Sequence, residues 1–151
     1  QHVQLLPQVR HAFLKVTAEI APNAWVRQCG RARSARRLAD RKGLVLDVLS
    51  LGFRSQAEWL GIATNPAFAG AYIFSAKANY AKIFPRFLAG LPDGGLIMCH
   101  PGFVDDALKS LDSLTDLREQ EFAFFSSDAF PEWMAKHGVT LADPGEGGGA
   151  S

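Results

Sequence analysis

Apolar side chains recur at spacings of three and four residues in several stretches of the chain, which predicts helices there. Shorter apolar or extended runs between them predict strands. The predicted helices cover residues 7–20, 44–60, 79–91, 105–111, 115–125 and 132–136, and the predicted strands cover residues 24–29, 62–66, 96–99 and 139–141. Helices and strands therefore alternate, which is typical of an α/β architecture with parallel strand pairing.

Some residues sharpen these predictions. Gly52 is a weak point or kink in the second helix, and Pro85 should bend the third helix or mark a boundary. Thr115 opens a further helix as a candidate capping residue. In the first helix the apolar positions are Val9, Phe13, Val16 and Ile20, with Leu14 and Ala18 alongside, which predicts an amphipathic helix. Leu117, Phe122 and Phe125 are expected to form the buried side of the helix that opens at Thr115.

The run 96–99 is continuously apolar, which suits a strand buried on both faces of a parallel sheet. It should stop at Pro101, which has no N–H to give to a strand ladder. A complete parallel barrel needs eight strands and about 250 residues. The four predicted strands therefore indicate half of a barrel or a small open sheet.

The composition indicates a globular protein, with 151 residues of which 48% are hydrophobic and 21% charged. We expect one domain over residues 1–141 and a disordered Gly-rich tail over residues 142–151. The net charge of +1 argues against a nucleic-acid or membrane-surface protein. The basic stretch 31–42 would be a nucleic-acid patch or a solvated helix face, and the second is favoured because no aromatic residue interleaves with its arginines.

The chain shows neither an apolar run long enough to cross a membrane nor a secretory signal, and we expect a cytoplasmic protein. Its two cysteines, Cys29 and Cys99, are too few for a disulfide framework, and we expect both to be reduced thiols. The sequence does not begin with Met, so we expect a processed form or a segment of a longer chain.

The strongest candidate for chemistry is His100, because active residues of parallel α/β folds lie where strands end. Pro101 and Gly102 make the following loop tight, which would fix the direction of the imidazole. A histidine here could act as a general acid or base, or bind a metal ion. The alternative is a histidine that only caps the loop through hydrogen bonds.

Other polar residues are weaker candidates. Cys99 should point away from His100 and be a core thiol, since adjacent strand residues face opposite sides. The group Arg118, Glu119 and Glu121 would be a polar cluster near a site or the solvated charges of a surface helix. The remaining histidines, at positions 2, 11 and 137, are expected to be surface residues, and no nucleotide-binding or structural-zinc motif occurs.

Four segments of the sequence, taken together, resemble a known family. Gln1-His2-Val3-Gln4-Leu5-Leu6-Pro7 resembles the family segment His-Gln-His-Val-His-x-x-Pro, with Gln4 in place of the last histidine. The others are Thr64-Asn65-x-x-Phe68-x-Gly70, Leu96-Ile97-Met98-Cys99-His100-Pro101-Gly102 and Arg118-Glu119-x-Glu121. In this order they resemble the YdjC-like carbohydrate deacetylases of the ChbG/HpnK type.

This resemblance implies that residues 1–141 are the C-terminal half of a modified (β/α) barrel related to polysaccharide deacetylases. It implies removal of acetyl groups from N-acetylated sugars or oligosaccharides with one divalent metal ion, Mg²⁺ or Zn²⁺, whose ligands would lie upstream of Gln1. His2 matches a motif position that is not a ligand. His100 would be the acid for the leaving amine, and the candidate sugar-binding residues are Asn65, Phe68, Arg118 and Glu121.

The alternative is a non-catalytic, degenerate member or a partial domain that binds a sugar or a partner chain. The replacement of a motif histidine by Gln4 mildly favours this alternative. An incomplete barrel would also leave an edge uncovered, through which the chain could self-associate.

Overall fold

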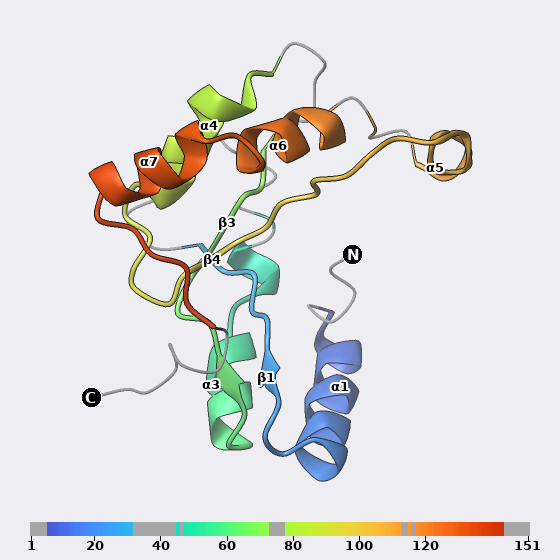
Figure 1. The fold of residues 1–151 in the computed structure, drawn as a ribbon. Coiled ribbons are helices and arrows are strands. Elements are labelled where there is room, and N and C mark those ends of the chain that lie inside the picture. Colours follow the sequence, from blue (N-terminus) through green and yellow to red (C-terminus); the bar gives the residue numbers. More distant parts are fainter. Residues whose placement is uncertain are drawn as a thin grey trace. The chain divides into compact units, whose positions relative to one another are not determined.

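The computed structural model describes residues 6–31, 45, 47–72, 78–112, 115 and 117–143 (Figure 1). The chain divides into two compact units. The first comprises Gln1–Ala69, Gly90–Leu96 and Ala142–Ser151, and the second comprises Gly70–Ala89 and Ile97–Leu141. The predictions for His2 and Gln4, for most of the basic stretch and for nearly all of the Gly-rich tail lie outside the described residues.

Helices and short strands follow one another along both units. They are α1 (Pro7–Ile20), β1 (Trp25–Val26), α3 (Phe53–Trp59), β2 (Ala63–Thr64), β3 (Phe68–Ala69), α4 (Tyr80–Leu88), β4 (Leu96–Ile97), α5 (Asp106–Leu111), α6 (Arg118–Phe125) and α7 (Ala129–Lys136). β1 and β2 run parallel, with Trp25 opposite Ala63, and β3 pairs with β4. This mixture of helices with small sheets confirms the α/β class.

The core of the first unit lies between α1, α3 and the parallel pair. Leu14, Phe53 and Ala57 are fully buried there. Gly52 has a positive φ of 75° and begins α3, so the weak point predicted at this glycine is a break between two helical stretches. Ile62, directly before β2, is also buried.

Of the apolar residues predicted for α1, the stripe of four is largely exposed, and only Leu14 beside it is fully buried. Val9, Phe13, Val16 and Ile20 are 39%, 40%, 48% and 78% exposed. The helix packs on α3 through another face, which carries the fully buried Leu14. Polar contacts hold that face: Arg10 donates to the carbonyl of Leu51 at 2.8 Å, and the His11 ring lies 3.2 Å from the Gln56 amide.

The core of the second unit is an aromatic cluster between α4, α6 and α7, which lie side by side (Figure 1). Tyr80, Phe84 and Met134 are buried at its centre. Half-buried aromatic rings surround them: Tyr72, Phe87, Phe124, Phe125, Phe130 and Trp133. The side chain of Asn79 caps α4 by accepting from the Lys82 amide, and Pro85 lies inside that helix instead of ending it.

Two strand predictions are wrong. The apolar run 96–99 gives only the two residues of β4, which are half-buried, because a two-stranded sheet covers little of either face. Residues 139–141 form no strand. The Val139 amide donates to the carbonyl of Met134 at 3.0 Å, and the Gly138 amide donates to the carbonyl of Ala135 at 3.2 Å. These two bonds cap the C-terminal end of α7.

No helix in the described part of the chain is both long enough and apolar enough to cross a membrane.

Gly70 should tolerate no side chain. Its φ is 96°, and a Cβ atom would lie 2.1 Å from the carbonyl oxygen of Met98. We expect Gly70→Ala to lower the free energy of unfolding by more than about 1 kcal/mol in a denaturant titration. Gly102→Ala is the control, since its Cβ would meet nothing within 4 Å, and its effect should stay within about 0.5 kcal/mol. Equal stabilities of the two variants would contradict the argument.

The exposed stripe of α1 should promote self-association. We expect the apparent mass in sedimentation to rise with protein concentration, and Val16→Lys to shift the chain toward the monomer, because it places a charge in the stripe. Lys15→Gln is the control, since Lys15 is an exposed neighbour that pairs with Glu19. A wild-type chain that stays monomeric at every concentration would refute this prediction.

Candidate functional site

His100 lies three residues beyond the end of β4, because the strand stops at Ile97 and not at Cys99 as the sequence predicted. Its backbone N–H donates to Oε2 of Glu121 on α6. Glu121 is fully buried, at 0% exposed, whereas His100 is half-buried. The first contact of the candidate site is therefore between a main-chain amide and a buried carboxylate.

The other oxygen of this carboxylate is also occupied. The Tyr72 hydroxyl donates to Oε1 of Glu121 at 2.6 Å, a short distance typical of a charge-assisted hydrogen bond. Burial, together with the hydrogen bond to Glu121 and its charge, raises the pKa of Tyr72. The phenol therefore stays protonated and remains a donor at neutral pH.

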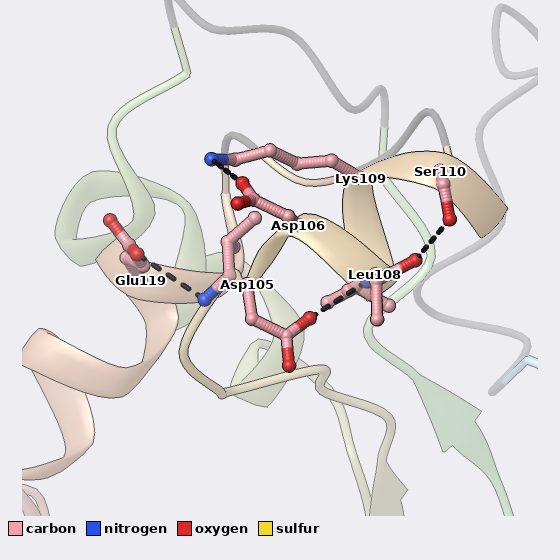
Figure 2. Close-up of polar contacts among 8 residues, drawn as sticks. Asp105, Asp106, Leu108, Lys109, Ser110 and Glu119 are labelled. Atoms are coloured by element: carbon pink, nitrogen blue, oxygen red, sulfur yellow. Dashed lines mark hydrogen bonds and ion pairs between the residues drawn. The ribbon is translucent and has the colours of Figure 1, made fainter.

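The loop that follows His100 is held on α6 by two further backbone amides. Gly102 donates to the carbonyl of Arg118 at 3.2 Å, and Val104 donates to Oε1 of Glu119 at 3.3 Å. Figure 2 shows the Glu119 carboxylate reaching this second amide. Amides at residues 100, 102 and 104 thus all donate to the first turns of α6.

Further contacts restrain α5 and the start of α6, which follow this loop in the chain. The Asp105 side chain accepts from the Leu108 amide at 2.7 Å and caps α5 (Figure 2). Arg118 forms an ion pair with Asp112 at 2.7 Å, which joins the start of α6 to the end of α5. The rings of Phe103 and Phe122 also lie 4.5 Å apart between centroids.

Cys99 is exposed, so the prediction of a core thiol is wrong. The regular strand ends at Ile97, and the alternation on which that prediction rested does not continue to Cys99. Although the residue as a whole is exposed, neighbouring atoms partly shield its sulfur from water, and this desolvation, together with the nearby charge of Glu121, raises the pKa of the Cys99 thiol. The thiol is therefore a poor nucleophile at neutral pH.

Asn65 and Phe68 belong to the first unit. The Asn65 side chain accepts from the Gln28 amide at 2.9 Å and donates to the carbonyls of Gln28 and Ala67 at 3.1 and 2.8 Å. Phe68 is 1% exposed, and the Arg27 guanidinium lies 5.8 Å from its ring centroid. Both residues thus lie in packed surroundings at the ends of short strands.

The structure therefore brings together three of the five predicted site residues within the second unit, namely His100, Arg118 and Glu121. Sequence reasoning missed Tyr72. The sequence also left open whether Glu121 lies near a site or on a solvated helix surface, although the helical spacing already indicated that it is buried. Glu121 follows Leu117 by four residues, so both lie on the same face, and Leu117 is 2% exposed. Phe122, expected to be buried, is instead 37% exposed.

The described residues contain no group of three or more His, Cys, Asp or Glu side chains that could hold a metal ion. His11 lies against Gln56 in the first unit. His137 stacks on Trp133 at the end of α7, with ring centroids 4.0 Å apart. Neither of these histidines lies in a cluster of candidate ligands.

The comparisons with known proteins agree with the family that the four sequence segments resemble. The family model described as YdjC-like protein matches residues 1–136, which include every helix and strand described above. No curated protein and no solved structure gave a significant match. Since the family match covers most of the chain, this protein belongs to the YdjC-like family, which is associated with carbohydrate deacetylase-like proteins.

Proposed function

We propose that this chain is part of a deacetylase that hydrolyses the amide of N-acetylated sugars, and that His100 protonates the leaving nitrogen. The observation that carries the proposal is the position of His100 beyond the end of β4, where a fully buried carboxylate holds its backbone amide. Family membership supports the coarser part, an enzyme related to carbohydrate deacetylases.

The chemistry explains why a fixed histidine is useful here. An amine leaves an amide readily only after its nitrogen gains a proton, and an imidazole can supply that proton near neutral pH. The acid must be aligned with the nitrogen, and a misplacement of about 1 Å can cost about 10²-fold in rate. The three amides of residues 100–104 that donate to α6 support this role, because they restrain the backbone from which the imidazole extends.

The remaining parts of the proposal rest on the resemblance. They are a modified (β/α) barrel of which this chain is the C-terminal half, a cytoplasmic location and a divalent metal ion, Mg²⁺ or Zn²⁺. The described residues do not fit a metal site, since they contain no cluster of three ligands. We therefore assign no step of this chain to the metal and propose that its ligands lie upstream of Gln1.

The proposed substrate is an acetylated amino sugar or an oligosaccharide of such sugars. The candidate residues for contacts with this sugar are those that the family resemblance implies, namely Asn65, Phe68, Arg118 and Glu121. The polar atoms of Asn65 and Glu121 already make internal hydrogen bonds, which favours supporting roles for these two side chains.

Replacing His100 tests the proposed acid. In the natural full-length protein, His100→Ala should lower kcat by about 10²–10⁴-fold with little change in KM, because proton donation occurs only in the transition state. The measurement is acetate release from an N-acetylated amino-sugar oligosaccharide. His137→Ala serves as the control, because this exposed histidine packs on Trp133 at the end of α7.

Two results would overturn the assignment. Full kcat in His100→Ala would make His100 a structural residue. Stoichiometric loss of metal from the same variant would make it a metal ligand.

A separate experiment tests where the metal ligands lie. We expect a chain limited to residues 1–151 to retain no stoichiometric zinc after gel filtration, because the described residues contain no three-ligand cluster. Elemental analysis of the purified chain measures this. One equivalent of zinc that disappears in His100→Ala would contradict the proposal that the ligands lie upstream.

A further inference from the structure

We infer that Glu121 is the positioning residue of the candidate site and acts on His100 through its main chain. Its kinetic consequence rests on the proposed function, whereas its structural part can be tested without any substrate. The inference follows from three features of the second unit: the burial of Glu121, the partners of its two oxygens and the kind of group that it holds.

A fully buried carboxylate is costly unless donors satisfy it. Glu121 is 0% exposed, and each of its oxygens accepts one hydrogen bond, from the Tyr72 hydroxyl and from the His100 amide. Because the side chain is fully buried, a sugar hydroxyl could reach these oxygens only if the surrounding groups moved. The carboxylate is therefore suited to hold the protein itself.

Tyr72 anchors this carboxylate to the core of the second unit. Its ring lies 5.9 Å from the ring of Tyr80 and 5.8 Å from that of Phe87, both in the aromatic cluster. The phenol is thus held by packed rings, and its hydroxyl restrains Oε1 of Glu121. A continuous line of contacts runs from the aromatic core through Tyr72 and Glu121 to the backbone of His100.

The choice of a main-chain donor has a chemical consequence. The bond from the His100 amide to Glu121 restrains the peptide plane before His100, and with it the origin of the imidazole side chain. This contact uses neither of the imidazole nitrogens. Positioning through the backbone is therefore compatible with proton transfer by the ring.

The structural part is tested by the amide resonance of His100 in nitrogen–proton correlation spectra of the full-length protein. We expect this proton to be shifted downfield by its carboxylate acceptor and to move upfield in Glu121→Ala. Glu121→Gln should keep much of the shift, since a carbonyl oxygen remains to accept. Glu119→Gln is the control, because Glu119 accepts from Val104 instead. An unmoved His100 amide in Glu121→Ala would overturn the inference.

A second variant guards against misfolding of Glu121→Ala. Tyr72→Phe keeps the packed ring and removes only the hydroxyl that restrains Oε1. We expect a smaller displacement of the same His100 resonance in this variant, with the thermal unfolding transition preserved. An unchanged resonance in a folded Tyr72→Phe variant would show that Tyr72 does not restrain the carboxylate, and the inferred line of contacts would fail.

The kinetic part is tested by a double-mutant cycle with His100. Glu121→Ala should lower kcat by about 10²-fold with little change in KM, the cost of a misplaced reacting group. Glu121→Gln should retain most of the wild-type kcat, since its carbonyl oxygen can still accept from the His100 amide. In a His100→Ala background the same Glu121→Ala change should have no further effect, because Glu121 acts only through His100.

The outcomes separate this inference from the proposed function. Equal losses of kcat from Glu121→Ala in both backgrounds would show that Glu121 acts independently of His100, and the positioning role would fail while the deacetylase stands. If the wild-type protein releases no acetate, the proposed function fails, and the His100 amide resonance still decides whether Glu121 positions the loop.

Discussion

The buried carboxylate of Glu121 is the interaction on which the candidate site depends. It joins three segments that are distant in sequence, namely Tyr72, the strand-end loop at His100 and the first turns of α6. An unsatisfied buried donor costs about 1–3 kcal/mol. The loop, the tyrosine and the helix therefore gain from remaining together, and the arrangement of the site is part of the stability of the second unit.

In the first unit, a neutral side chain, that of Asn65, makes the hydrogen bonds to backbone groups beyond a short strand. β1 and β2 contribute only two residues each, so the ladder between these strands is short. Beyond these strands, Asn65 accepts from the Gln28 amide and donates to its carbonyl, which continues the pairing of the two segments through a side chain. Gln28 in turn donates to the carbonyls of Gly30 and Asn65 at 3.2 and 3.1 Å. In both units, a buried polar side chain thus forms hydrogen bonds with the backbone beyond the end of a short strand.

The sequence predicted the existence of the helices well, because apolar spacing and Pro7 act locally. Some bounds were wrong: the helix expected over residues 44–60 breaks at Gly52, and α6 begins at Arg118 without a cap from Thr115. The sequence could not predict which face of α1 is buried. That choice depends on the contacts of Arg10 and His11 with residues about 40 positions away. The strands were predicted too long for a related reason, since an apolar run indicates burial only where further strands or helices cover it.

Candidate residues at strand ends were predictable by type but not by role. Asn65 and Glu121 stood out as polar residues in recognisable segments, yet sequence alone does not show that their oxygens accept from backbone amides. Tyr72 carried no signal of its own, because an isolated tyrosine in an apolar stretch has many possible partners. Its hydrogen bond to Glu121 appears only when the aromatic cluster is assembled.

The three amides that hold the loop also account for the order His100-Pro101-Gly102. The donors are at residues 100, 102 and 104, so each of these positions needs a backbone N–H. Proline has none, and at any of the three it would remove one contact with α6. Pro101 lies between two of them, at a position from which α6 receives no hydrogen bond. There its ring restricts the backbone next to His100 without removing a donor, so rigidity and attachment to α6 are combined in the same short loop.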